Sequence, residues 1–152
     1  MGRLTDRLST AQLIGLDTSI FIYHLEAHTT YSPLTGEIFT GIETGQWSAA
    51  TSIISMMELT VHPWKLNRQD VARRYEALLV HFPSLSLHDV DRDIARGAAQ
   101  LRARFNIRPA DALQAATCMV HSASPFITND SRLSRLQSIL DVLILEDFVS
   151  RE

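Results

Sequence analysis

Residues 13–19 read Leu-Ile-Gly-Leu-Asp-Thr-Ser, a short apolar run that stops at Asp17. An uninterrupted apolar run of this length is typical of a strand that is buried on both faces of a sheet. Thr18 and Ser19 are residue types that cap helices, so a helix is expected to follow and to reach about residue 27. A buried strand that leads directly into a helix indicates βαβ units and a parallel sheet.

The same alternation of strand-length apolar runs and helical periods continues along the chain. We expect strands over 13–16, 47–51, 85–87, 125–128 and 142–145. We expect helices over 18–27, 33–43, 52–61, 68–81, 91–105, 109–121 and 131–137, the third ending before Pro63 because the residue before a proline is disfavoured in a helix. The predicted fold is α/β, a three-layer α/β/α sandwich whose central, mostly parallel sheet has about five strands.

Length and composition are those of an ordinary globular domain. The 152 residues, 45% of them hydrophobic and 20% charged, suit one domain over 1–152, with 1–12 as an extension before the first strand. The single cysteine, Cys118, lies in an apolar run and is expected to be a buried, inert thiol. No run reaches the ~20 apolar residues that span a bilayer. No secretory signal is recognisable, so the cytoplasm is the expected location and no membrane is expected as a partner.

Four acids are placed where converging parallel strands would bring them together. Asp17 and Asp130 end expected strands, Glu58 is the one charge in an apolar helix, and Asp111 falls in the first turn of a helix. Each acid alone has an ordinary explanation as a helix cap or a solvent-facing side chain. Ligands in open α/β sheets, however, bind beyond the carboxyl ends of the strands, and a parallel sheet collects such positions at one edge.

Converging carboxylates would need a cation. Two unit charges ~4 Å apart repel by ~4 kcal/mol at an effective dielectric of 20. An oxygen-only ligand set favours a hard cation, Mg²⁺ or Mn²⁺, over zinc. Asp17 and Asp111 are the first choice for direct ligands, and Glu58 and Asp130 are expected to act through water. The net charge of −3 and the pI of about 6.0 leave no basic footprint, so any nucleic-acid contact would have to be local.

The sequence around these acids resembles a known family. Four short runs occur in the order and with the approximate spacing of the signatures of PIN domains, namely residues 16–22 (Leu-Asp-Thr-Ser-Ile-Phe-Ile), 55–59 (Ser-Met-Met-Glu-Leu), 109–116 (Pro-Ala-Asp-Ala-Leu-Gln-Ala-Ala) and 127–130 (Ile-Thr-Asn-Asp). The compact size is most similar to the VapC toxins of toxin–antitoxin pairs. One departure is that residues 1–12 precede a first strand that usually begins near the start of the chain in this family.

The resemblance implies an activity, a metal and partners. It implies a Mg²⁺- or Mn²⁺-dependent endoribonuclease, usually a homodimer, that hydrolyses RNA with a metal-activated water and is held inactive by a cognate antitoxin. Asp17, Glu58, Asp111 and Asp130 match the acidic quartet. The supporting polar positions are Thr18, Ser19, Thr128 and Asn129. Arg108 and Arg132 adjoin the acids in sequence and are candidate contacts to RNA phosphate.

Two other classes of function remain open from the sequence. A phosphoacceptor domain of receiver or haloacid-dehalogenase type also places an aspartate after its first strand. The dehalogenase pattern needs a second aspartate where Ser19 stands, and Lys65 is the only lysine available to a receiver. A non-catalytic PIN-like interaction module would keep the fold without needing the acids to converge. The spacing of His24 and His28 favours two solvated side chains over a zinc site.

Overall fold

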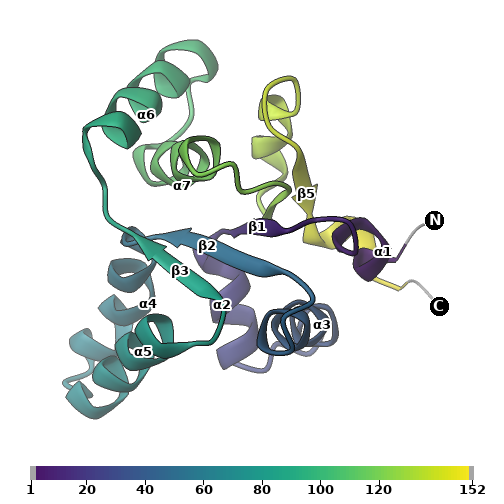
Figure 1. The fold of residues 1–152 in the computed structure, drawn as a ribbon. Helices are drawn as coiled ribbons and strands as arrows, with labels where there is room; N and C mark the ends of the chain where they lie inside the picture. The colour runs from purple at the N-terminus through teal and green to yellow at the C-terminus, as the bar shows by residue number, and fades with distance from the viewer. Residues whose placement is uncertain (1–2, 151–152) are drawn as a thin grey trace.

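The central sheet has five parallel strands. The computed structural model describes residues 3–150. Its strands are β1 (Leu13–Leu16), β2 (Ser48–Ser52), β3 (Leu85–His88), β4 (Phe126–Thr128) and β5 (Val142–Ile144). They lie in the order β3-β2-β1-β4-β5, and all four neighbouring pairs are parallel (Figure 1). The sequence therefore located the strands to within about a residue, and "mostly parallel" becomes wholly parallel.

Helices cover both faces of the sheet (Figure 1). One face carries α2 (Thr18–Leu25), α3 (Ser32–Glu43), α4 (Ile54–Lys65) and α5 (Gln69–His81). The other carries α6 (Arg92–Phe105), α7 (Pro109–Val120) and the 3₁₀ helix η1 (Ser131–Leu136). Each layer packs on the sheet through its own cluster of buried apolar side chains, which confirms the α/β/α sandwich. A second 3₁₀ helix, η2 (Leu145–Phe148), replaces the expected end of the last strand.

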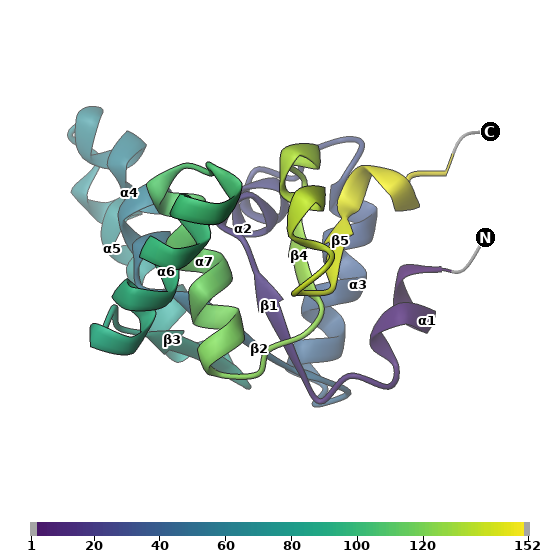
Figure 2. The ribbon, with the colours of Figure 1, turned by 90° about the horizontal axis from the view of Figure 1, so that it is seen from above.

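The N-terminal extension is a short helix that packs on the domain. The helix α1 (Leu4–Leu8) buries Leu4 and Leu8 in the same apolar cluster as α3. Arg7 pairs with Asp141 at 3.1 Å, just ahead of β5. As a result α1 and the C-terminal η2 lie on the same side of the molecule (Figure 2). Residues 1–2 of the predicted extension lie outside the described residues.

The predicted end of α4 before Pro63 is wrong. The helix continues through Pro63 to Lys65, and the proline is buried. A proline inside a helix loses one backbone hydrogen bond, a cost of about 3 kcal/mol. The turn is closed beyond it by the N–H groups of Leu66 and Arg68, which donate to the carbonyls of His62 and Pro63. The buried Pro63 ring lines an apolar groove with Leu25 of α2 and Val71 of α5, and this packing favours the continued helix.

The strand order places a switch point between β1 and β4. From β1 the chain proceeds to β2 and β3 on one side, and β4 and β5 lie on the other. In open α/β sheets the crevice at the carboxyl ends of such strands is where ligands bind. The buried Cys118 of α7 contacts Gly15 so closely that a Cβ at position 15 would overlap its Sγ. This close approach brings α7 against β1, and with it the first turn of α7 to the switch point.

Among residues 3–150, no helix combines the length and apolar character needed to cross a membrane.

Candidate active site

All four predicted acids line one cleft at the carboxyl edge of the sheet. The cleft has a volume of about 490 Å³. It is open and mainly polar. The side chains that line it include Asp17 after β1, Glu58 on α4, Asp111 on α7, Asp130 after β4, and also Thr18, Ser19, Tyr23, Arg108 and Asn129. The switch point thus gathers residues that are up to 113 positions apart, from Asp17 to Asp130, in the sequence.

Asp17 lies at the buried end of the cleft. One carboxylate oxygen accepts from the backbone N–H of Thr18 at 2.8 Å, which caps α2, and the other accepts from the hydroxyl of Thr128 at 2.7 Å. Burial raises the pKa of this carboxyl to about 6, against the two hydrogen bonds, and the charges of Asp111 and Glu58 raise it further. Asp17 is therefore both the expected cap and a carboxylate whose ionised form lacks a counter-charge.

Glu58 is held by α2 across the cleft. The hydroxyl of Thr18 donates to its carboxylate at 2.7 Å. Thr18 therefore holds two acids at once. Its backbone N–H binds Asp17, and its side-chain hydroxyl binds Glu58. The sequence signal that marked Glu58 is its position as the one charge in the apolar segment 53–61, and in the structure its side chain is half-buried.

Arginines neutralise the other two acids. Arg108 bridges them, with Nε 3.1 Å from Asp111 and Nη2 3.4 Å from Asp130. Arg132 binds Asp130 through two further contacts, the shorter of 2.7 Å, and these lower the pKa of Asp130. Asp130 also caps η1 by accepting from the backbone N–H of Arg132 at 3.0 Å. The two arginines expected to contact RNA therefore bind the acids in this structure.

A buried polar network beneath the cleft was missed by the sequence analysis. The amide of Gln114, 1% exposed, donates to the hydroxyls of Ser55 at 2.8 Å and Thr18 at 3.3 Å, and its oxygen accepts from the N–H of Ser52 at 3.2 Å. Because Gln114 donates to Thr18, the single hydroxyl proton of Thr18 is left for Glu58. A glutamine on the apolar face of α7, one turn after Asp111, was the available signal.

The remaining predicted polar residues differ in their roles. Asn129 accepts from the N–H of Glu146 at 2.8 Å and donates to the hydroxyl of Tyr23 at 3.2 Å, so it ties β4 to η2 and α2. Ser19 lines the cleft, and its hydroxyl oxygen is buried without a hydrogen-bond partner among the described residues. It is the one buried side-chain polar atom of this kind within residues 3–150.

The donor set suits a hard cation, although no ligand cage is preassembled. Within residues 3–150, no three histidine, cysteine, aspartate or glutamate side chains lie close enough to hold a metal ion. The guanidinium of Arg108 lies between Asp111 and Asp130, so a cation already occupies that part of the cleft. Burial, together with the nearby charges of Asp111 and Glu58, raises the pKa of Asp17, and a bound cation would favour its ionised form. The carboxylate oxygens of the cleft are the ligand type that suits a hard divalent cation.

The histidine pair of the sequence does not form a unit. His24 stacks on Phe39 with ring centroids 4.5 Å apart, and His28 stacks on Tyr31 at 4.7 Å. His28 lies beyond the end of α2, so the two imidazoles do not share a helix face.

The fold and the cleft define an α/β/α protein with an acidic site at the switch point of a parallel sheet. The chain belongs to the PIN-domain family, whose sequence pattern it matches over residues 14–139. Family membership favours the nuclease class over the phosphoacceptor alternative. No curated protein is significantly similar to it in sequence.

Solved structures of toxin–antitoxin complexes share the fold. A chain of the VapBC2 complex of Rickettsia felis, crystallised with a DNA fragment from its promoter, has a TM-score of 0.68 and 17% identity, covering 89% of this chain and 98% of that one. A chain of a toxin–antitoxin complex from Klebsiella pneumoniae has a TM-score of 0.63 and 21% identity, covering 88% and 97%. A chain of VapBC-5 from Mycobacterium tuberculosis has a TM-score of 0.56 and 25% identity, covering 88% and 96%.

Proposed function

We propose that the protein is a metal-dependent endoribonuclease that hydrolyses phosphodiester bonds of RNA. PIN domains of the VapC type are nucleases, so the family supports a hydrolase that acts on nucleic acid. The observation that carries the proposal is the convergence of four acids on one cleft, where the pKa of Asp17 is raised to about 6 by burial and by Asp111 and Glu58. Repulsion of Asp17 by Asp111 and Glu58 lowers the stability of the metal-free fold, and a bound cation would offset it.

Each acid has a distinct part in holding the cation. Asp17 and Asp111 would be direct ligands of Mg²⁺ or Mn²⁺, with Glu58 and Asp130 acting through water. When bound, the ion lowers the pKa of a water molecule and stabilises charge on the attacked phosphate and the leaving oxygen. Thr18 and Thr128 orient the carboxylates of Glu58 and Asp17 by the hydrogen bonds that they donate.

The arginines are proposed to serve the substrate. A guanidinium binds a carboxylate and a phosphate with the same fork of N–H donors. Arg108 would be free to bind the scissile phosphate if its carboxylate partners held a metal ion. Arg132, which is 59% exposed, would contact the next part of the backbone. Local arginines of this kind allow RNA binding by a protein whose net charge is −3.

The test is cleavage of RNA by purified protein with and without metal. We expect new RNA ends with Mn²⁺ or Mg²⁺, none in excess chelator, and none for Asp17→Asn or Asp111→Asn. Sequencing of the new ends of total RNA would also define the preferred target. Equal cleavage by metal-free protein would overturn the proposal. Absence of both cleavage and Mn²⁺ binding would favour the non-catalytic interaction module.

We further propose that the chain acts as the toxin of a toxin–antitoxin pair. The support is the shared fold with chains of the Klebsiella pneumoniae and Rickettsia felis complexes. A cognate antitoxin, a homodimer and a cytoplasmic location follow from this proposal. Expression of the chain alone should arrest growth, expression of Asp17→Asn should not, and a protein encoded beside it should relieve the arrest. Harmless accumulation of active wild-type protein in its native host would contradict it.

A further inference from the structure

A second cavity adjoins the acidic cleft and is lined by arginines. It has a volume of about 240 Å³ and shares Arg108 and Asp111 with the cleft. Its wall is completed by the loop after α6 and by η1, through Asn106, Ile107, Arg132, Leu133 and Arg135. A chain that passes over the acids can therefore continue into this cavity without leaving the surface between α7 and η1.

Arg135 differs from the other two arginines in how it is held. Its Nε donates to the carbonyl of Arg132 at 3.1 Å, and its Nη1 donates to the carbonyl of Phe105 at 3.0 Å. Carbonyl acceptors fix the guanidinium but leave its charge in place. Among the described residues it has no carboxylate partner, whereas Arg108 and Arg132 are both paired with Asp130. Arg135 therefore brings to the cavity a positive charge that no carboxylate among residues 3–150 pairs with.

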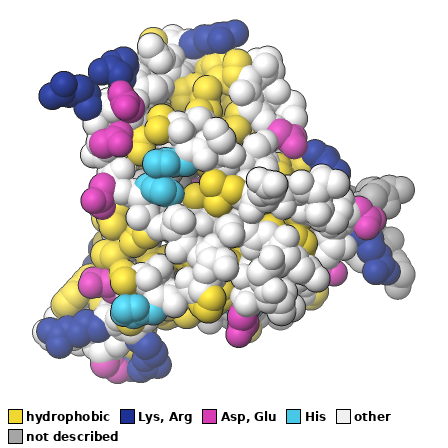
Figure 3. Space-filling view, in the orientation of Figure 1, with side chains coloured by type: hydrophobic (Ala, Val, Ile, Leu, Met, Phe, Trp, Pro, Cys, Tyr) yellow, Lys and Arg dark blue, Asp and Glu magenta, His cyan; other side chains and the backbone are white. Residues whose placement is uncertain are grey.

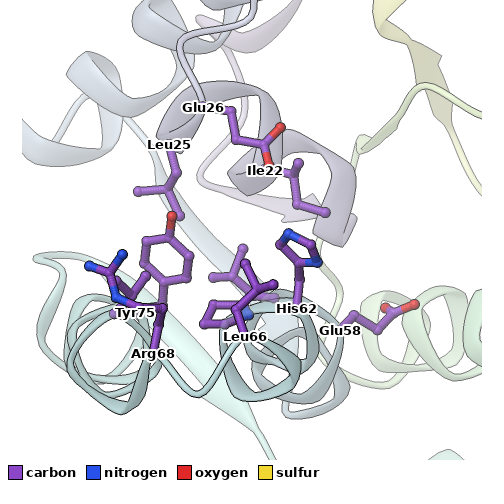
Figure 4. A pocket seen from close by; sticks show the side chains of 11 residues that line it. Ile22, Leu25, Glu26, Glu58, His62, Leu66, Arg68 and Tyr75 are labelled. Atoms are coloured by element: carbon purple, nitrogen blue, oxygen red, sulfur yellow. The ribbon is translucent and has the colours of Figure 1, made fainter.

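The opposite side of the cleft is unsuited to a phosphate chain. A groove of about 260 Å³ runs from Glu58 between α2, α4 and α5. Its wall is largely apolar, with Ile22, Leu25 and Leu66 facing it, and its acidic side chains are Glu26 and Glu58 (Figure 4). The one arginine there, Arg68, is paired with Asp70 at 3.3 Å.

The face of the molecule drawn in Figure 3 shows no continuous basic track among the described residues. Its basic side chains lie in separate groups at the periphery, most of them near acidic side chains. Polynucleotide backbones are bound mainly by basic side chains that neutralise successive phosphates. The arginine cavity offers such side chains directly beside the acids.

We propose that this cavity is a subsite for a neighbouring phosphate of the RNA strand, with Arg135 as its principal contact. The inference rests on the proposed ribonuclease function and adds a direction to it, from the acids toward η1. A phosphodiester group held there would fix the register of the strand relative to the metal-binding carboxylates. It would contribute to substrate binding and leave the acids themselves unchanged.

The test is a cycle that removes the arginine and the phosphate charge separately. The substrate is a short RNA that wild-type protein cleaves with Mn²⁺, prepared with a neutral methylphosphonate at each position in turn outside the scissile bond. We expect one such position to lower kcat/KM about tenfold, mainly through KM, as loss of a charge-assisted hydrogen bond would. Arg135→Gln should lower kcat/KM by a similar factor and reduce the slope of log KM against log salt by about 0.7.

The two changes should not add. When Arg135→Gln is given the RNA with the sensitive methylphosphonate, its kcat/KM should fall little further, because the arginine that contacts this phosphate is already absent. Arg73→Gln, on the exposed surface of α5, is the matched control and should behave as wild type. The subsite would be overturned if Arg135→Gln had the same kcat/KM and salt dependence as the Arg73→Gln control. It would also be overturned if wild type cleaved every methylphosphonate substrate as well as the unmodified RNA. In both cases the proposed nuclease function would be unaffected. If Arg135→Gln does not fold, the wild-type scan decides alone. Wild-type protein without any cleavage would overturn the proposed function and the subsite with it.

Discussion

At the scale of single residues, Asp17 carries the clearest electrostatic conflict. Its pKa in the folded protein is about 6, above the ordinary 3.8. The folded state therefore binds more protons than the unfolded state between these values, so stability falls as the pH rises from about 4 to about 6 and stays lower above that. A shift of about two units corresponds to an upper value of about 3 kcal/mol.

Asp17→Asn should remove this penalty in the metal-free protein. Asparagine keeps an acceptor for the Thr18 N–H and is an equally good helix cap. The free energy of unfolding of the variant should equal or exceed that of wild type at pH 8, by up to about 3 kcal/mol, and the difference should vanish near pH 4. Denaturant titrations of both proteins at several pH values provide the measurement. A variant that is clearly less stable at pH 8 would show that the carboxylate is chiefly structural.

Arg108 gives a second prediction, because its guanidinium lies where a cation would bind. Arg108→Gln should bind Mn²⁺ more tightly than wild type in the absence of RNA, on the order of tenfold, since Asp111 then has no cationic partner and Asp130 keeps only Arg132. Isothermal calorimetry measures this directly. Arg96→Gln, whose partner Asp93 lies on α6 away from the cleft, serves as control. Unchanged or weaker Mn²⁺ affinity in Arg108→Gln would contradict the competition.

The four acids were predictable as single residues because their signal is local. Asp17 and Asp130 follow apolar strand runs, and Asp111 follows a proline that begins a helix. The arginine contacts were not predictable in the same way. Arg108 meets Asp130 across 22 positions only because the residues that precede α7 and η1 meet at the cleft, and side-chain pairing of this kind leaves no periodic pattern in the sequence.

At the scale of elements, the network around Gln114 joins α7 to α2, β2 and α4. The amide contacts Thr18, Ser52 and Ser55, one residue from each element. Replacing it leaves buried donors and acceptors without partners, which costs about 1–3 kcal/mol for such a group. The network therefore couples the packing of four elements to the position of Glu58.

Gln114→Leu should destabilise the protein by about 2–3 kcal/mol in denaturant unfolding, because leucine fills the space but satisfies none of these groups. Gln100→Leu, at an exposed position of α6, should change stability by less than ~0.5 kcal/mol. A Gln114→Leu protein as stable as the Gln100→Leu control would mean that water satisfies the network equally well.

Element boundaries show where local rules give way to packing. The strands and most helices follow from apolar runs and helical periods, but α4 passes through Pro63 where the local rule ends it. The proline contributes its ring to the apolar groove beside α2, and that contact is made by residues distant in sequence. A rule based on neighbouring residues cannot predict this packing contact.

At the scale of the whole molecule, the alternation of strands and helices predicted the sandwich, and the carboxyl edge predicted where the acids meet. The order of the strands was not predictable in detail, because equivalent apolar runs such as β1 and β4 can exchange neighbours without changing the sequence pattern. It is this order, with β1 and β4 adjacent, that sets Asp17 beside Thr128 at 2.7 Å.

The chemistry assigned to the acids is tested most directly by the ends of the cleaved RNA. Attack by a metal-activated water leaves a 5′-phosphate and a 3′-hydroxyl, and the ribose 2′-hydroxyl takes no part as nucleophile. A histidine-driven ribonuclease would use that hydroxyl and leave a cyclic phosphate, but no histidine lines the acidic cleft among the described residues. The measurement is end-group analysis of one short RNA beside the same RNA with a single 2′-deoxy nucleotide at the scissile position. We predict 5′-phosphate and 3′-hydroxyl ends and only modest slowing by the deoxy sugar. Cyclic phosphate ends with complete protection by the deoxy sugar would contradict the assignment.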